Sequence, residues 1–238
     1  MSYSGRLDLS PSHRAPIETD GVKLWKTMIL DVDPASHDPA PSGHLIEQAP
    51  GETIRAHFHA CPQFQVIVNG SGLLGRAPVA PFLVHYTRSH TGYGPIVAGE
   101  RGMWYLTLRP SPRFPAQYLP ESREALHNGQ PKFQVTSELC PPGTANATRP
   151  LVEMIAPRPD GLAVWAQYVA PDTQAAPPRH VGGAARYYLV TRGELLHEGR
   201  PHGYLSLLWT EPDDDFATLQ AGPAGLELII MQFPGDAF

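Results

Sequence analysis

The feature that most constrains the fold of this 238-residue chain is an internal repeat at an offset of 123 residues. Residues 63–70 line up with residues 186–193, and the strand expected at 103–108 lines up with 226–231. No net insertion is needed across about 50 aligned positions, and self-similarity at a fixed spacing indicates a repeated structural unit. Further matched pairs are His57 with His180, Tyr86 with Trp209 and Tyr93 with Phe216. We therefore predict two copies of one small barrel.

Composition favours strands over helices. The chain has 27 Pro and 22 Gly but only 17% charged residues, which suits many short strands joined by turns and predicts an all-β fold. With 42% hydrophobic residues, 238 positions can form one large domain or two small ones. The net charge of −5 and the lack of a basic block argue against nucleic acid or a membrane surface as partner. We expect a small molecule as partner instead.

The sequence also bears on the cellular location of the protein. Residues 1–11 contain no apolar stretch of signal-peptide length, and no run approaches the roughly 20 apolar residues of a membrane span. Two cysteines, Cys61 and Cys140, do not form a disulfide framework. We therefore expect a cytoplasmic protein. We also expect a homodimer, for which the second copy of the repeat could serve as the dimerisation element.

A pair of histidines marks the candidate site. His57 and His59 are one residue apart on an extended segment, so their side chains project from the same face. An apolar alternation begins at Gln63 and is expected to end in a turn at Asn69-Gly70. This strand, loop and second strand would let His57, His59 and Gln63 converge, and two imidazoles with one oxygen donor form half of a divalent-metal site.

The spacing of residues 51–70 resembles the first signature of the cupin family, Gly-x5-His-x-His-x3-Glu-x6-Gly, with Gln63 where that family usually has its Glu ligand. Residues 82–95 look like the second signature, and its ligand His falls on Tyr93. The resemblance implies a double-stranded β-helix, or jelly-roll barrel. Two copies would make a bicupin with a degenerate metal site.

The repeat sets the expected domains. Residues 1–20 are expected to be a loosely ordered N-terminal arm, 21–139 the first barrel, opening with a strand at 22–30, 140–150 a linker, and 151–238 a degenerate second barrel. In that second copy the positions of His59, Gln63 and Tyr93 hold Gly182, Arg186 and Phe216. We expect the second barrel to carry no metal and to be structural.

The first barrel holds the candidate site residues. By the resemblance, His57 and His59 would bind a divalent metal (Fe, Mn, Ni or Zn), and Gln63 would either complete the site as a weak ligand or hydrogen-bond the bound molecule. Tyr93 could bind the metal, donate a proton or fill the space of the lost His. His85 lies eight residues before Tyr93, so on a regular strand it faces the same cavity and could replace that His.

Four more predictions complete the site. We interpret Tyr93 and His85 as catalytic residues and Gln65 as a substrate-binding residue, since it shares the face of Gln63. Cys61 is either a second substrate-binding residue or a small buried apolar side chain. The remaining histidines in polar or Pro/Gly-rich contexts are expected to be solvated: His13, His37, His44, His127, His197 and His202.

Three functions are compatible with this pattern. The first is a metal-dependent enzyme acting on a small organic molecule, with dioxygenase, isomerase, cyclase or lyase chemistry as the resemblance implies. The alternative is a non-catalytic barrel that binds a small ligand and has lost its metal, which the changes at Gln63 and Tyr93 favour. A purely structural, seed-storage-like bicupin is disfavoured by the short chain and the polar cavity.

Overall fold

The computed structural model describes residues 2–33, 35, 40–111, 115–126, 131–137, 150–180, 182 and 184–236. Throughout this part of the chain the regular elements are β-strands, apart from two short 3-10 helices, η1 (Arg123–Leu126) and η2 (Pro212–Asp214). The all-β prediction is therefore confirmed. None of the described helices is long and apolar enough to cross a membrane.

The chain divides into two compact units. We call Asp8–Ser137 the N-terminal barrel, and Met1–Leu7 together with Glu138–Phe238 the C-terminal barrel. The expectation of a loosely ordered arm at residues 1–20 is wrong, because two strands form there: β1 (Tyr3–Gly5) pairs with a strand of the C-terminal barrel, and β2 (Arg14–Thr19) belongs to the N-terminal barrel. Most of the proposed linker, with Cys140, lies outside the described residues.

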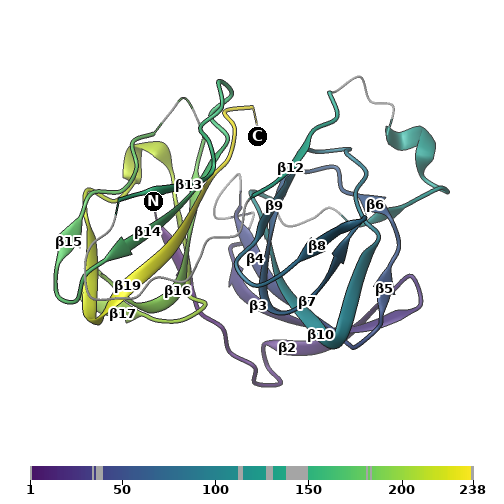
Figure 1. Cartoon of the computed structure of the whole chain (residues 1–238), viewed down its shortest axis with the longest axis horizontal. Coiled ribbons are helices and arrows are strands. Elements are labelled where there is room, and N and C mark those ends of the chain that lie inside the picture. Colours follow the sequence, from purple (N-terminus) through teal and green to yellow (C-terminus); the bar gives the residue numbers. More distant parts are fainter. Residues whose placement is uncertain are drawn as a thin grey trace. The chain divides into compact units, whose positions relative to one another are not determined.

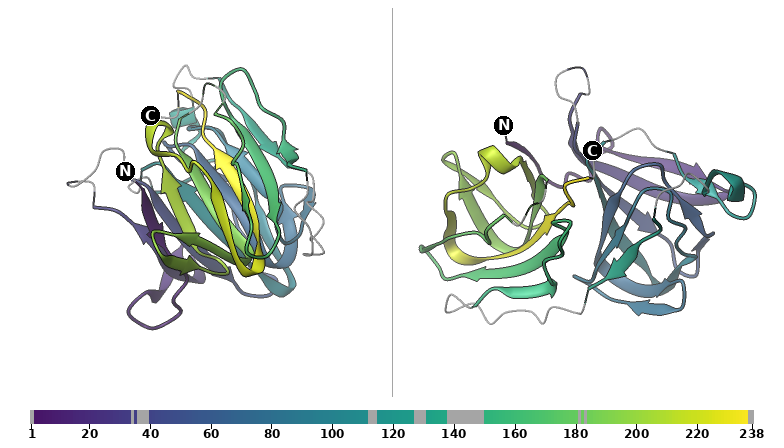
Figure 2. Two further views of the ribbon diagram at one scale, coloured as in Figure 1. Left: turned by 90° about the vertical axis from the view of Figure 1, so that its left-hand side faces the viewer. Right: turned by 90° about the horizontal axis from the view of Figure 1, so that it is seen from above.

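The N-terminal barrel is one curled antiparallel sheet, whose strands surround an interior in Figures 1 and 2. Its strand order is β12-β9-β7-β10-β4-β3-β2, with β5 on β10 and β8 on β7, while β11 and β6 form a separate pair. The bounds are β3 Val22–Asp31, β4 Ser42–Gln48, β5 Thr53–Ile54, β6 His57–Phe58, β7 Gln63–Leu74, β8 Ala77–Val79, β9 Val84–Thr87, β10 Ile96–Arg109, β11 Gln117–Tyr118 and β12 Gln134–Thr136.

The C-terminal barrel repeats this arrangement. Its strand order is β1-β18-β16-β19-β14-β13, with β15 on β19 and β17 on β16. The bounds are β13 Val152–Ile155, β14 Ala163–Val169, β15 Gln174–Ala175, β16 Arg186–His197, β17 Arg200–His202, β18 Leu207–Thr210 and β19 Leu219–Gln232.

The strand registers reproduce the internal repeat. In the N-terminal barrel Gln63 pairs with Thr87, and in the C-terminal barrel Arg186 pairs with Thr210, each 123 residues later. The strands before the site follow an offset of 121, since Ile54 pairs with Ile96 as Ala175 pairs with Leu219. Two additional residues therefore lie between β15 and β16, in the segment that matches the His57 region.

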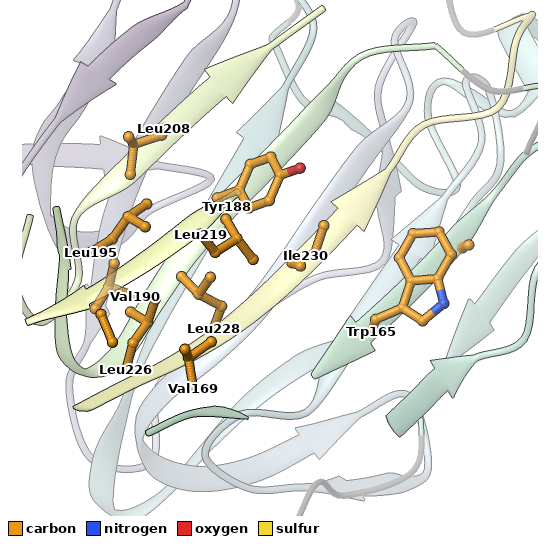
Figure 3. Packing of buried hydrophobic residues seen from close by; sticks show 12 residues of the cluster. Trp165, Val169, Tyr188, Val190, Leu195, Leu208, Leu219, Leu226, Leu228 and Ile230 are labelled. Carbon is orange, nitrogen blue, oxygen red and sulfur yellow. The ribbon is translucent and has the colours of Figure 1, made fainter. Parts of the chain in front are cut away.

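The two barrels differ in the side chains that pack in their interiors. Leucine and valine side chains from β16, β18 and β19 pack together in the C-terminal barrel, with Tyr188 beside them and Trp165 at one end (Figure 3). The N-terminal barrel has an apolar half of eleven buried residues that includes Ile67, Met103, Tyr105 and Tyr93. Its other half is polar, and this half contains the candidate site.

The predicted turn at Asn69-Gly70 is wrong. Strand β7 continues to Leu74, and its pairing with β10 shifts register between Trp104 and Tyr105 and again between Ala98 and Met103. Gly70 has a φ of 72° at this irregularity, a conformation that glycine adopts easily. The Asn-Gly signal therefore marks a β-bulge in a long bent strand.

Gly70→Ala tests this bulge. An added Cβ would clash with the carbonyl oxygen of Gly102, so we expect the free energy of unfolding to fall by roughly 3 kcal/mol or more. Gly21→Ala is the matched control, because Gly21 also has a positive φ but nothing lies within 4 Å of a Cβ added there. It should cost only about 1 kcal/mol. Equal losses in urea unfolding would show that the close backbone contact does not matter.

Candidate functional site

The structure brings the predicted metal ligands together. His57 on β6 and Tyr93 are joined by two backbone hydrogen bonds, of 3.1 Å and 3.0 Å, which hold the loop of Tyr93 against β6. The rings of His57 and His59 lie 5.3 Å apart between centroids, and those of His57 and Tyr93 lie 4.5 Å apart. All three side chains are buried, as is Gln63 on β7.

A guanidinium group lies among these residues. Arg109, the last residue of β10, donates from Nε to Gln63 Oε1 at 3.0 Å and from Nη2 to His59 Nε2 at 2.9 Å. Its side chain is only 8% exposed. Arginine keeps its charge at any physiological pH, so a permanent positive charge is built into the polar half of the barrel.

The hydrogen bonds continue from Arg109 in one direction. Gln63 Nε2 donates to the Tyr93 hydroxyl at 2.6 Å, and that hydroxyl bonds His57 Nε2 at 2.8 Å. His57 Nδ1 lies 2.8 Å from the carbonyl oxygen of Arg55, which can only accept, so Nδ1 carries the proton. Burial, chiefly, and the charge of Arg109 lower the pKa of His57, so its ring is neutral and Nε2 accepts from Tyr93.

This arrangement does not fit a divalent metal. A metal would need the lone pairs of His57 Nε2, His59 Nε2 and Gln63 Oε1, and each of these already accepts a hydrogen bond from Tyr93 or Arg109. Burial raises the pKa of Tyr93, which opposes a phenolate ligand. Among the described residues, no three His, Cys, Asp or Glu side chains form a group that could hold a metal ion.

His85 faces the barrel interior, as its parity on the strand predicted. Its ring centroid is 5.8 Å from that of Tyr93. However, its nitrogens bond to the hydroxyls of Thr136 and Thr87, both at 2.8 Å, so it does not act as a third ligand beside His57 and His59. Burial lowers its pKa to about 4.

His85 borders two spaces. With Gln65 it lines an interior cavity of about 10 Å³, which is about the room that one water needs. With Tyr93, Gln134 and Thr136 it lines a more open pocket of about 240 Å³. A neighbouring pocket of about 390 Å³ also includes Tyr93 and Gln134 and adds Leu119 and Lys132. Tyr93 and His85 thus line the open pocket, and His85 and Gln65 line the interior cavity.

Cys61 lines none of these three spaces. It is buried, and burial raises the pKa of its thiol to about 11. A protonated, buried thiol is a weak nucleophile, which agrees with the interpretation of Cys61 as a small apolar side chain.

Two residues of the polar half were missed in the sequence. Arg109 stands next to a Pro-rich break, yet the repeat aligns it with Gln232 just as it aligns Gln63 with Arg186, and this exchange of Arg and Gln was the signal. His44 was expected to be solvated, but it is only 9% exposed on β4, where it pairs with Thr107. His37 and His127 lie outside the described residues.

The C-terminal barrel contains an ionic cluster at the positions that match Gln63 and Arg109 in the repeat. Arg186 is fully buried and donates to Gln232 Oε1 from Nε at 3.0 Å and to Asp215 Oδ2 from Nη1 at 2.6 Å. Tyr188 and Thr210 donate to the other Asp215 oxygen at 2.5 Å and 3.0 Å, and His180 Nε2 lies 3.0 Å from Oδ2. Burial alone would raise the pKa of Asp215, but these partners outweigh it and lower that pKa.

Comparison with solved structures identifies the fold. An 11S globulin from Wrightia tinctoria matches 100% of this chain and 84% of its own at a TM-score of 0.63 and 12% identity. An oxalate decarboxylase from Lactobacillus farciminis, solved as a formate complex, has a TM-score of 0.61 and 12% sequence identity. The match covers 97% of this chain and 86% of the decarboxylase chain. Vicilin from hazelnut (Corylus avellana) has a TM-score of 0.59 and 11% sequence identity. The match covers 98% of this chain and 86% of the vicilin chain.

These matches confirm the predicted fold, two cupin barrels in one chain. The fold is shared with an enzyme and with globulins, so it does not by itself select a function. Neither protein-family models nor curated proteins match the sequence.

His85→Leu tests the buried neutral histidine and copies Leu208, its counterpart in the repeat. Between pH 6.5 and 4 the unfolded chain binds a proton at this position and the folded chain does not, so stability falls as the pH falls through this window, by up to about 3 kcal/mol. The variant should lose correspondingly less stability over that range in denaturant unfolding. Parallel pH profiles for the two proteins would contradict a neutral His85.

Asp215→Asn tests the ionic cluster of the C-terminal barrel. Removing the carboxylate charge leaves the fully buried Arg186 without its counter-ion, so the free energy of unfolding at pH 7 should fall by roughly 3 kcal/mol or more. Asp213→Asn, at an exposed position two residues away, should change it by less than about 0.5 kcal/mol. Similar effects of the two variants would show that Asp215 does not balance Arg186.

Proposed function

We propose that the N-terminal barrel binds a small organic molecule and does so without a divalent metal. The observation that supports this most directly is the position of Arg109, whose guanidinium group hydrogen-bonds two of the three predicted metal ligands, His59 and Gln63. A fixed cation at this point repels a second cation and attracts polar or anionic ligands.

The surroundings of Arg109 support a binding pocket over a purely structural core. Polar side chains in a barrel interior lower stability unless they are paired, and the N-terminal barrel keeps several of them where the C-terminal barrel has apolar ones. Leu208 matches His85, and Phe216 matches Tyr93. The open pocket at Tyr93 and His85 offers space for a small molecule, and His85 separates it from the interior cavity at Gln65.

The metal-dependent enzyme remains the second candidate, because His57 and His59 do lie side by side. It requires Arg109 to leave their neighbourhood, so it predicts metal binding by the wild-type chain. Small molecules occur elsewhere in this fold: the Wrightia globulin has an auxin binding site and the decarboxylase was solved with formate. Those ligands belong to those proteins, and the present proposal rests on Arg109.

Arg109→Met separates the two candidates. The wild-type chain, purified without chelators and offered Mn, Fe, Ni and Zn, should hold far less than one equivalent of metal. The variant removes the hydrogen bonds from Arg109 to His59 Nε2 and Gln63 Oε1 together with the positive charge, so its affinity for metal should rise at least about tenfold, or 1.4 kcal/mol. Elemental analysis and calorimetric titration measure both.

Two controls accompany this experiment. Arg109→Lys keeps the charge and should not gain metal, and Arg101→Met removes an exposed charge from the same strand and should behave as wild type. One equivalent of metal in the wild-type chain, lost on His57→Ala, would refute the proposal and support the metal-dependent enzyme.

A further inference from the structure

Three polar side chains form a row across adjacent strands on the inner wall of the N-terminal barrel. Thr107 on β10 pairs with Gln65 on β7 and with His44 on β4, so all three project from the same face of the sheet. The three residues are 3%, 5% and 9% exposed, respectively. We call Gln65, Thr107 and His44 the polar row.

The polar row has no hydrogen-bond partner in the described part of the chain. Neither the Gln65 amide, the Thr107 hydroxyl nor the His44 ring bonds to any described residue. Their polar atoms are not among the fully enclosed unpaired side-chain atoms of the described residues, so they border open space and can receive a partner from outside the chain. Three neighbours without partners on one wall are typical of a surface that receives a polar ligand.

The fold does not require polar residues at these positions. In the C-terminal barrel Ile230 pairs with Tyr188 and with Trp165, which is the same row one repeat later. Figure 3 shows these three buried side chains on the three neighbouring strands. One barrel thus closes this row with aromatic and aliphatic groups, while the other lines it with an amide, a hydroxyl and an imidazole.

Two cations lie beside the polar row. Arg109 is two residues from Thr107 on the same face, and Lys26 pairs with Ile46, two residues from His44. Burial chiefly, then the charges of Lys26 and Arg109, hold the pKa of His44 well below its usual value. Lys26 forms no ion pair with a described residue, and Asp31 is the acid whose charge reaches it. The local field therefore favours an anion.

The next row along the same wall is apolar. Tyr105 pairs with Ile67 and with Ile46, and these three buried residues belong to the apolar half of the barrel. A ligand that places an anionic group on the polar row would therefore lay an apolar body against this neighbouring row. Inorganic phosphate has no such body to bury.

We propose that the polar row binds the carboxylate of a small organic acid, with its apolar body on Ile67, Tyr105 and Ile46. Such a ligand is larger than one water, so the cavity of about 10 Å³ beside Ile67 and Tyr105 widens when the ligand binds. Thr107, the Gln65 amide and one nitrogen of neutral His44 donate to the carboxylate oxygens, and Arg109 and Lys26 supply the positive field. Lys26 is half-buried, so this end of the row reaches solvent. The inference rests on the proposed function, since it names the ligand class of the same barrel.

Butyrate is a suitable probe, with butyramide as its neutral analogue and inorganic phosphate as the anion without an apolar body. We expect calorimetric titration and thermal unfolding to show saturable butyrate binding to the metal-free wild-type chain. Thr107→Val and Lys26→Met should each weaken butyrate binding about tenfold. Lys23→Met, at an exposed position on the same strand, should leave binding unchanged.

Thr107→Val also separates a ligand contact from a structural role. The variant replaces a buried hydroxyl that has no described partner, so the ligand-free chain should be as stable as wild type or more stable while butyrate binding falls. A loss of stability together with binding would indicate a structural hydroxyl and overturn the assignment.

The remaining outcomes are also decisive. Binding of butyramide or of phosphate in place of butyrate, or no binding of any probe, would overturn the carboxylate assignment and leave the metal-free proposal to the Arg109→Met experiment. Butyrate binding that appears only after a divalent metal is added would refute the proposed function itself.

Discussion

The hydrogen bond from Arg109 to Gln63 determines the chemistry of the N-terminal barrel. Because Arg109 can only donate, Gln63 must present its carbonyl oxygen to it, and the Gln63 amide nitrogen therefore points at Tyr93. The Tyr93 hydroxyl in turn donates to His57. One guanidinium group thus orients three side chains that would otherwise be free to face a metal, and it adds the charge that makes the interior attractive to anions.

The C-terminal barrel contains the same hydrogen bond between an arginine and a glutamine, but each residue lies on the strand that carries the other in the N-terminal barrel. Arg186 on β16 donates from Nε to Gln232 on β19 at 3.0 Å, whereas in the N-terminal barrel Arg109 on β10 donates to Gln63 on β7 at the same distance. Each arginine lies at the level where the resemblance would place a metal. In the C-terminal barrel Asp215 balances the charge from within the protein, and the site is closed by its own side chains.

The sequence predicted the parts of this structure that depend on local pattern. Alternation predicted strands near 22–30, 63–70 and 103–108, the repeat predicted two barrels, and strand parity placed His85 and Gln65 on the inner face. Local pattern did not reveal Arg109, because the residue ends its strand beside Pro110 and is brought to Gln63 by pairing across the sheet; only the exchange of Arg and Gln between the two copies pointed to it. The prediction that His44 is solvated was wrong for the same reason. Its burial depends on the strands that pair with β4, and the residues before it in the sequence resemble a loop.

The two barrels therefore illustrate how one fold can divide stability and binding between its copies. A buried cation needs hydrogen-bond acceptors. In the C-terminal barrel Arg186 finds them in Gln232, Asp215 and the Pro178 carbonyl. These contacts within the chain occupy the guanidinium group, so it is not available to a ligand. The N-terminal barrel instead leaves the polar row without partners in the described part of the chain, so its donors remain available to a ligand. Since the matching row of the other barrel is Tyr188, Ile230 and Trp165, the fold does not require polar side chains here, and the proposed ligand gives a physical reason to keep them.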